Sequence, residues 1–324
     1  WASESGHALG NEYQESNSVF VIPDTLSGGV GTFIKIIGKT DAAAIAPVLR
    51  GSDANKRRVL YLAGADTTVR LENIEITGGN SGSAVGGGGI YIGTGGEVIL
   101  GAGAKIVANR CEGVVTDTVH DANAVKAGGG ILVNGGRLAL SAGAEIAGNR
   151  TPYSVSSAGP NGAGGGAAII RGGVIEMTGG VIGESLGGSI PGNAVYGGAN
   201  TGYGGGVAVW TAGNFEMTGG VIRRNSLQSN GDQRAGGGGV WVAGTFKMSG
   251  TARIVENANT TNHNGGGVKV YGGTFSVTAL AGSGLEITGN TRQSVANNVH
   301  KYSGVFILNG TSYANGLYGP FGPY

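Results

Sequence analysis

The chain has 324 residues, of which 70 are glycine and 7 are proline, and its formal net charge is +1. Glycine is far above its usual share of about 7 per cent, but no Gly-X-Y period runs through the chain, which excludes a collagen helix. Hydrophobic residues make up 40% of the chain and recur in register, so the composition also excludes disorder. The small net charge gives no reason to expect a nucleic-acid partner, and no apolar run reaches the roughly 18 residues of a transmembrane segment.

The N-terminal residues 1–32 are polar except for one apolar segment and are predicted to form an extension with one strand. That strand contains Val19, Phe20, Val21 and Ile22. A chain that starts without Met is typical of a processed, exported protein, so we expect a secreted, extracellular location at the cell surface.

Longer and less regular strands are predicted next, at residues 33–37, 58–62 and 69–76, where they would form one or two coils. Only residues 41–46 have a helical composition, and Pro47 limits that segment. The chain is therefore predicted to be built from strands and turns almost throughout.

Six copies of one repeat follow. Each copy has a glycine run, an alternating apolar strand, a Gly-Gly or Ala-Gly pair, a second strand and a third strand that ends in Ile. The distance from the glycine run to this Ile varies little, from 15 residues (Gly239 to Ile254) to 20 residues (Gly267 to Ile287). The stretch that follows varies much more, so all large insertions fall at one angular position of a stacked solenoid. The glycine runs close at Gly89, Gly130, Gly166, Gly206, Gly239 and Gly267, and the isoleucines are Ile106, Ile146, Ile182, Ile222, Ile254 and Ile287.

Apolar residues alternate with other residues in the first two strands of each repeat, and this period of two predicts strands with one inward face. In Val240-Trp241-Val242, for example, the valines would point inward and Trp241 outward. We therefore predict an all-β fold: a right-handed parallel β-helix (solenoid) over residues 33–308, with three short strands per coil and variable loops on one edge. The inward residues of the second strands are Val98 and Leu100, Leu138 and Leu140, Ile175 and Met177, Phe215 and Met217, Phe246 and Met248, and Phe275 and Val277.

Two columns are predicted to point outward, one on the first strands and one on the second strands. A polysaccharide-cleaving enzyme would need clustered carboxylates on such a surface. Stacking places Glu176 beside Glu216, but Lys247 on the next rung is typical of charge balance on a solvated face. The first column is Tyr91, Leu132, Ala168, Ala208, Trp241 and Lys269, and the second is Ile99, Ala139, Glu176, Glu216, Lys247 and Ser276.

In most repeats an Asn lies three residues after the Ile that ends the third strand. Asn tolerates tight bends and its amide can bond the next coil, so stacked copies predict a structural amide ladder. Its predicted members are Asn109, Asn149, Asn225, Asn257 and Asn290, with Ser185 as the one exception.

No cluster of residues predicts a metal, a cofactor or catalysis. Cys111 is the single cysteine, and the histidines are far apart in the sequence without the spacing of metal ligands. We therefore predict that the chain is not an enzyme and has no cofactor. Sequons for N-glycosylation occur at Asn149, Asn259 and Asn309, and Asn259 is the candidate because it lies in an insert. The histidines are His7, His120, His263 and His300.

The inserts between repeats carry tyrosines among small polar residues, a composition that suits adaptable contact with a partner. Tyr153, Tyr196 and Tyr203 are the candidate contacts, and the alternative is that the inserts are solvated loops without a role. The inserts are residues 110–127, 150–163, 186–203, 226–236 and 258–264.

Residues 309–324 form a C-terminal tail rich in aromatic residues, Gly and Pro. A β-helix has two unpaired ends, and exposed edges invite further strand pairing unless they are capped. The tail and the N-terminal strand either cap their own ends or dock on neighbouring copies, which would join molecules end to end into a fibre. The candidate subunit contacts are Tyr313, Tyr318, Phe321 and Tyr324 in the tail and Val19, Phe20, Val21 and Ile22 in the strand.

The repeat as a whole resembles the β-helical passenger domains of bacterial autotransporters, particularly the polymorphic outer-membrane protein type. That family pairs Gly-Gly-Ala-[Ile/Leu/Val] with Phe-x-x-Asn. This chain has Gly where the family has Ala, as in Gly88-Gly89-Ile90, and Ile where the family has Phe. The resemblance covers residues 60–308. It implies an extracellular surface protein used in adhesion or surface structure, and it brings no catalytic residues.

Three functions remain open at this point. The first is a non-enzymatic extracellular structural protein that self-associates into a filament, sheath or surface layer. The second is a surface adhesin that binds a host or matrix surface through the inserts. The third is a polysaccharide lyase or hydrolase, or a sugar-binding β-helix.

Overall fold

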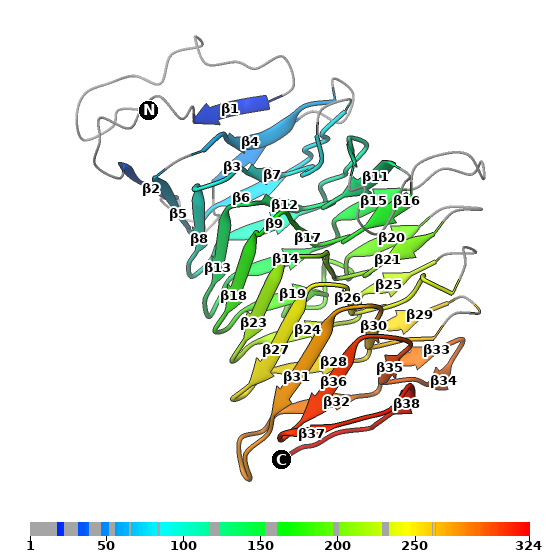
Figure 1. Cartoon of the computed structure of the whole chain (residues 1–324). Coiled ribbons are helices and arrows are strands. Elements are labelled where there is room, and N and C mark those ends of the chain that lie inside the picture. Colours follow the sequence, from blue (N-terminus) through cyan, green and yellow to red (C-terminus); the bar gives the residue numbers. More distant parts are fainter. Residues whose placement is uncertain are drawn as a thin grey trace.

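A computed structural model shows an all-β parallel β-helix, which confirms the predicted fold class (Figure 1). No helix occurs among the residues that the structure describes. These are residues 18–22, 32–38, 47–51, 56–64, 66–82, 85–116, 124–152, 161–196, 201–228, 233–260, 262 and 264–324. The segment 41–46, with its helical composition, lies outside this set.

Three long sheets run along the molecule and match the three strands predicted for each repeat. Sheet I contains β1 (Ser18–Ile22), β4 (Arg58–Leu62), β7 (Ile90–Ile92), β12 (Ile131–Asn134), β17 (Ala167–Ile170), β22 (Val207–Val209), β26 (Val240–Val242), β30 (Val268–Val270), β35 (Val299–Lys301) and β38 (Gly316–Tyr318). Sheet II contains β2 (Thr32–Ile37), β5 (Thr67–Glu72), β8 (Glu97–Leu100), β13 (Arg137–Leu140), β18 (Val174–Met177), β23 (Asn214–Met217), β27 (Thr245–Ser249), β31 (Thr274–Thr278), β36 (Val305–Leu308) and β37 (Thr311–Ser312). Sheet III contains β3 (Val48–Arg50), β6 (Glu75–Thr77), β9 (Lys105–Val107), β14 (Glu145–Ala147), β19 (Val181–Gly183), β24 (Val221–Arg223), β28 (Arg253–Val255) and β32 (Glu286–Thr288).

The inserts add two further sheets between sheet III and sheet I, so they are not only loops. Sheet IV contains β10 (Val114–Thr116), β11 (Ala124–Ala127), β16 (Asn161–Ala163) and β21 (Gly202–Tyr203). Sheet V contains β15 (Arg150–Pro152), β20 (Ala194–Tyr196), β25 (Ser226–Leu227), β29 (Ala258–Asn259), β33 (Thr291–Arg292) and β34 (Val295–Ala296).

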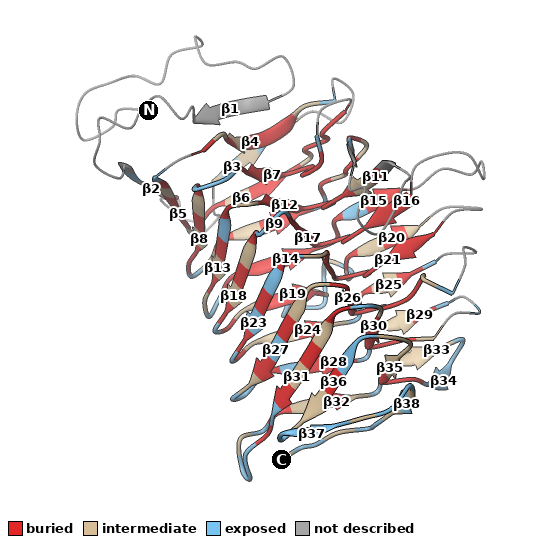
Figure 2. Cartoon of the chain, viewed as in Figure 1, coloured by how far each residue is buried: buried red, intermediate tan, exposed pale blue. Residues whose placement is uncertain are grey.

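The core is built from the predicted inward columns. Strands of sheet II alternate buried with less buried residues, as Figure 2 shows, and their inward side chains are buried. Phe246 stacks between Phe215 and Phe275, with ring centroids 4.7 Å and 4.8 Å away. Like residues stack because parallel pairing in register repeats each position about every 4.8 Å along the axis.

A buried ladder of asparagines stands where the third strand ends, as predicted, but it has no gap. The prediction that Ser185 interrupts it is wrong, because the chain makes a detour after β19 and returns with Asn193 in the missing rung. Asn193 Oδ1 accepts from Asn149 N at 3.0 Å, and Asn193 Nδ2 donates to Asn225 Oδ1 at 3.0 Å and to Ile146 O at 2.8 Å. The full ladder is Asn109, Asn149, Asn193, Asn225, Asn257, Asn290 and Asn298.

Each glycine run fits between this ladder and the neighbouring coils. In the run that precedes β22, Gly204 has φ +63°, a conformation that disfavours a side chain. A Cβ on Gly205 would lie 2.4 Å from both Gly238 O and Ser226 O, and a Cβ on Gly206 would lie 2.9 Å from Asn225 Nδ2. Glycine is needed here because backbone and buried amides fill the space that a side chain would take.

The C-terminal tail closes its own end of the β-helix. After β36 the chain reverses, and β37 pairs antiparallel with β36 while β38 pairs antiparallel with β35. The tail then crosses sheet III, where Phe321 exchanges two backbone hydrogen bonds with Ile287. The last parallel strands of the three sheets, β35, β36 and β32, are thus each paired with the chain's own tail.

Candidate functional site

The outward face of sheet I is buried, which corrects the prediction of an exposed first-strand column. Leu132, Ala168 and Ala208 have no exposed surface, and they pack in one cluster with Ala163 and Tyr203 of sheet IV. The inserts fold onto this face and form a second hydrophobic core. Its residues therefore contribute to stability and leave no open surface for a ligand.

The three tyrosines predicted as insert contacts have different fates. Tyr203 is only 1% exposed. Its ring centroid lies 5.1 Å from that of Trp210, in an edge-on arrangement, and 4.7 Å from that of Trp241. The prediction that Tyr203 faces a partner is therefore wrong. Tyr196 is half-buried beneath the guanidinium of Arg150, 5.8 Å from its ring. Tyr153 lies outside the described residues. Of the two described tyrosines, Tyr203 therefore serves internal packing and Tyr196 is partly covered by Arg150.

The outward column of sheet II has the predicted register, with Glu176 opposite Glu216 and Glu216 opposite Lys247 on successive rungs. Arg137, one rung earlier, makes a bidentate ion pair with Glu176 and a second pair with Glu97, Nη1 to Oε1 at 2.5 Å. The hydrogen bond to Glu176 is the main cause that raises the pKa of Arg137 above its usual value. Glu176 is therefore held as the partner of an arginine, which is a structural arrangement of charges.

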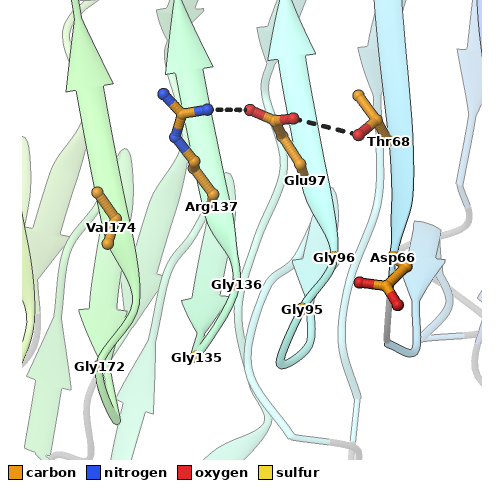
Figure 3. A pocket seen from close by; sticks show the side chains of 10 residues that line it. All are labelled: Asp66, Thr68, Gly95, Gly96, Glu97, Gly135, Gly136, Arg137, Gly172 and Val174. Atoms are coloured by element: carbon orange, nitrogen blue, oxygen red, sulfur yellow. Dashed lines mark hydrogen bonds and ion pairs between the residues drawn. The ribbon is translucent and has the colours of Figure 1, made fainter. Parts of the chain in front are cut away.

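A shallow trough of about 530 Å³ lies at the bend between sheets I and II (Figure 3). Glycines form its floor over three successive rungs, and Asp66, Thr68, Glu97 and Arg137 point from its wall. Glu97 is fixed from both sides, since its other oxygen accepts from Thr68 Oγ1 at 3.1 Å. Asp66 is the remaining carboxylate of the lining. Hydrolysis of a glycoside needs two carboxylates with separate roles, and this wall offers only one that is not held in an ion pair.

Metal and thiol chemistry find no support in the described residues. No group of three or more His, Cys, Asp or Glu side chains is arranged there to hold a metal ion. His7, His120 and His263 lie outside the described part of the chain. Cys111 is buried, its Sγ lies 3.3 Å from Gly113 O, and burial raises the pKa of its thiol. A thiol in this state is a poor nucleophile.

Two of the three sequons are inaccessible. Asn259, the candidate glycosylation site, is fully buried in β29, and Asn149 is buried in the amide ladder, so the prediction for Asn259 is wrong. Asn309 is exposed at the turn between β36 and β37, and its Oδ1 accepts from Ala279 N at 2.7 Å. Among these sequons only Asn309 presents its amide to the surroundings.

The tail residues predicted as subunit contacts pack on the chain's own core. The ring centroid of Phe306 lies 5.2 Å from that of Tyr313, 5.6 Å from that of Tyr318 and 5.8 Å from that of Phe321. Tyr324 is also partly buried against this core. Of the two alternatives for the tail, the structure has the one in which it caps its own chain.

The N-terminal end differs from this closed end. Strand β1 pairs with β4, but the side chains of Val19, Phe20, Val21 and Ile22 lie outside the described part of the structure. No described residue pairs with the outer edges of β1, β2 and β3.

Apolar side chains are exposed at this same end, which the sequence reasoning did not single out. Phe33 is 59% exposed, Ile37 47% and Val48 43%. A signal was present in β2, whose sequence TFIKII is apolar on both faces instead of alternating. These three residues, named here the N-terminal apolar edge, are the best candidate for a functional surface.

Comparison of the chain with family models, with curated proteins and with solved structures gave no match. The described residues also contain no helix that is long and apolar enough to cross a bilayer.

Proposed function

We propose that the chain is a non-enzymatic structural protein, a rigid β-helical rod that associates with copies of itself through its N-terminal end. The observation that carries the proposal is the difference between the two ends. The tail pairs with β35, β36 and Ile287 at the C-terminal end, whereas no described residue pairs with the outer edges of β1, β2 and β3, beside which Phe33, Ile37 and Val48 are exposed. Exposed edges and apolar patches are both typical of association surfaces.

The geometry favours a pair over a fibre. An endless filament needs the front of one copy to bind the back of the next, and at the C-terminal end the edges of β35 and β36 are already paired with the chain's own antiparallel strands. Two N-terminal ends can instead meet about a twofold axis, so that the same surface of each copy is used. A sheath or layer would then need additional lateral contacts between these pairs.

The proposed location is outside the cell, at its surface. Support comes from the resemblance of the Gly-Gly-[Ile/Val] and Ile-x-x-Asn repeat to autotransporter passenger domains. The adhesin alternative has less support, because sheets IV and V take up much of the inserts and Tyr203 is buried.

Replacing both Phe33 and Ile37 by Ser is expected to weaken association between copies at least tenfold. Each apolar side chain that is buried in a contact contributes about 1.5–3 kcal/mol, and each factor of ten corresponds to about 1.4 kcal/mol. Sedimentation equilibrium over a wide concentration range measures the change. Leu186→Ser is the matched control, since Leu186 is exposed in the insert after β19, far from this edge. A wild-type chain that stays monomeric at every concentration contradicts the proposal.

The polysaccharide-enzyme alternative has its own test. Cleavage of uronate polymers can be measured by ultraviolet absorbance. We expect no turnover by the wild-type chain or by Glu176→Gln, because Glu176 is held by Arg137. Turnover by the wild type that Glu176→Gln abolishes would show that this column is catalytic.

A further inference from the structure

A lysine and a histidine lie in direct contact beneath the C-terminal cap. Lys269 projects from the outer face of sheet I and is only 1% exposed. Its Nζ lies 3.0 Å from Nδ1 of His300 on the next rung and 5.0 Å from the ring centre of Tyr302. A charged Lys269 ammonium can only donate, so with Lys269 charged the contact takes a neutral His300 whose Nδ1 accepts.

His300 belongs to the strand that carries the cap. It lies in β35, directly opposite Leu317 of β38 in the antiparallel ladder. The next residue, Lys301, donates from Nζ to Tyr313 O of the tail at 2.8 Å. A disturbance at His300 therefore acts on the strand that holds β38 in place.

Among the described residues, the charged groups that act on His300 are cationic. They are Lys269 from β30 and Arg292 from β33, while β38 contributes the apolar Leu317. Burial, then repulsion from Lys269 and from Arg292, lowers the pKa of His300 from its usual 6.5 to about 4. Protonation would place a second positive charge 3.0 Å from a buried ammonium group, where water screens it poorly.

We propose that the Lys269–His300 pair is an acid-sensitive latch, whose protonation releases β38 and the tail that follows it while the body of the β-helix stays folded. The sign follows from linkage, because the released state binds a proton more readily than the capped state. The contribution of this group to the stability of the cap is fully present above pH 6.5, falls as the pH drops from 6.5 to about 4, and changes no further below that. This inference does not depend on the proposed function.

Hydrogen exchange of the intact chain, corrected for the intrinsic pH dependence, tests the latch. Between pH 7 and pH 4 we expect protection of the amides in residues 316–321 to fall by about ten- to hundredfold, a loss smaller than the full pKa shift because His300 is partly exposed. Amides of β22 and β23 should keep their protection. In His300→Gln the amide oxygen can still accept from Lys269 but never becomes charged, so the cap should stay protected at pH 4.

Three results would overturn the proposal. The first is equal loss of cap protection in wild type and His300→Gln. The second is a parallel loss in β22 and β23, which would indicate global unfolding. If His300→Gln does not fold, NMR titration of the wild-type imidazole decides: an apparent pKa of 6.5 or above contradicts the latch, and one near 4 supports it.

Discussion

Asn193→Ala is expected to lower the free energy of unfolding by roughly 3–5 kcal/mol. The substitution removes the acceptor of Asn149 N and the donor to Ile146 O, both inside the molecule. It also removes the side-chain amide of Asn193 that donates to Asn225 Oδ1. An unsatisfied buried polar group costs about 1–3 kcal/mol, and several are created at once.

Urea unfolding followed by circular dichroism measures this change. The control is Asn214→Ala, because Asn214 is exposed on β23 and its Nδ2 donates to the carbonyl of Ala212, two residues earlier, at 3.2 Å. We expect a loss below about 0.5 kcal/mol for this control. Equal stability of the two variants would mean that the ladder accompanies the fold without stabilising it.

The ladder also shows where a sequence period stops being informative. Counting three residues from Ile182 leads to Ser185, but the chain loops out and Asn193, eight residues later, takes the rung. A count along the chain cannot distinguish a missing rung from a delayed one. The remaining five predicted positions are correct because no insertion separates their Ile from their Asn.

The inward columns and the register of sheet II could be read from the sequence, since alternation fixes which face is buried and the constant repeat fixes which residues pair. Glu176 and Glu216 pair as expected for this reason. The outer face of sheet I could not be assigned by alternation alone. Its strands Ala167–Ile170 and Val240–Val242 are apolar at every position, a pattern typical of strands that are covered on both faces.

The ends of the molecule were the least predictable part. The aromatic composition of the tail indicated burial, but composition does not say whether Tyr313 and Phe321 are buried against their own chain or against a neighbour. Only the reversal at β36 and β37 decides this, because it brings the rings onto Phe306. The exposure of Phe33 likewise depends on which strands lie beside β2.

Gly205→Ala is expected to have the larger effect of the two substitutions argued here, a loss of at least about 3 kcal/mol or failure to fold. The added methyl group would lie 2.4 Å from the carbonyl oxygens of Gly238 and Ser226, and both belong to backbone held in neighbouring rungs. Neither oxygen can retreat without breaking its own ladder. The coils would have to separate locally, and the adjacent amide of Asn225 would lose its fit.

Gly187→Ala is the control for this change. Gly187 is exposed in the insert after β19, its φ is not in the left-handed region, and the nearest atom to an added Cβ is Ser189 Oγ at 4.0 Å. Thermal unfolding of both variants should show a control within a few degrees of wild type and a Gly205→Ala chain that is strongly destabilised or insoluble. If Gly205→Ala unfolds like the control, the coils do not pack closely at the glycine runs. The proposed role as a rigid structural rod would then lose its support.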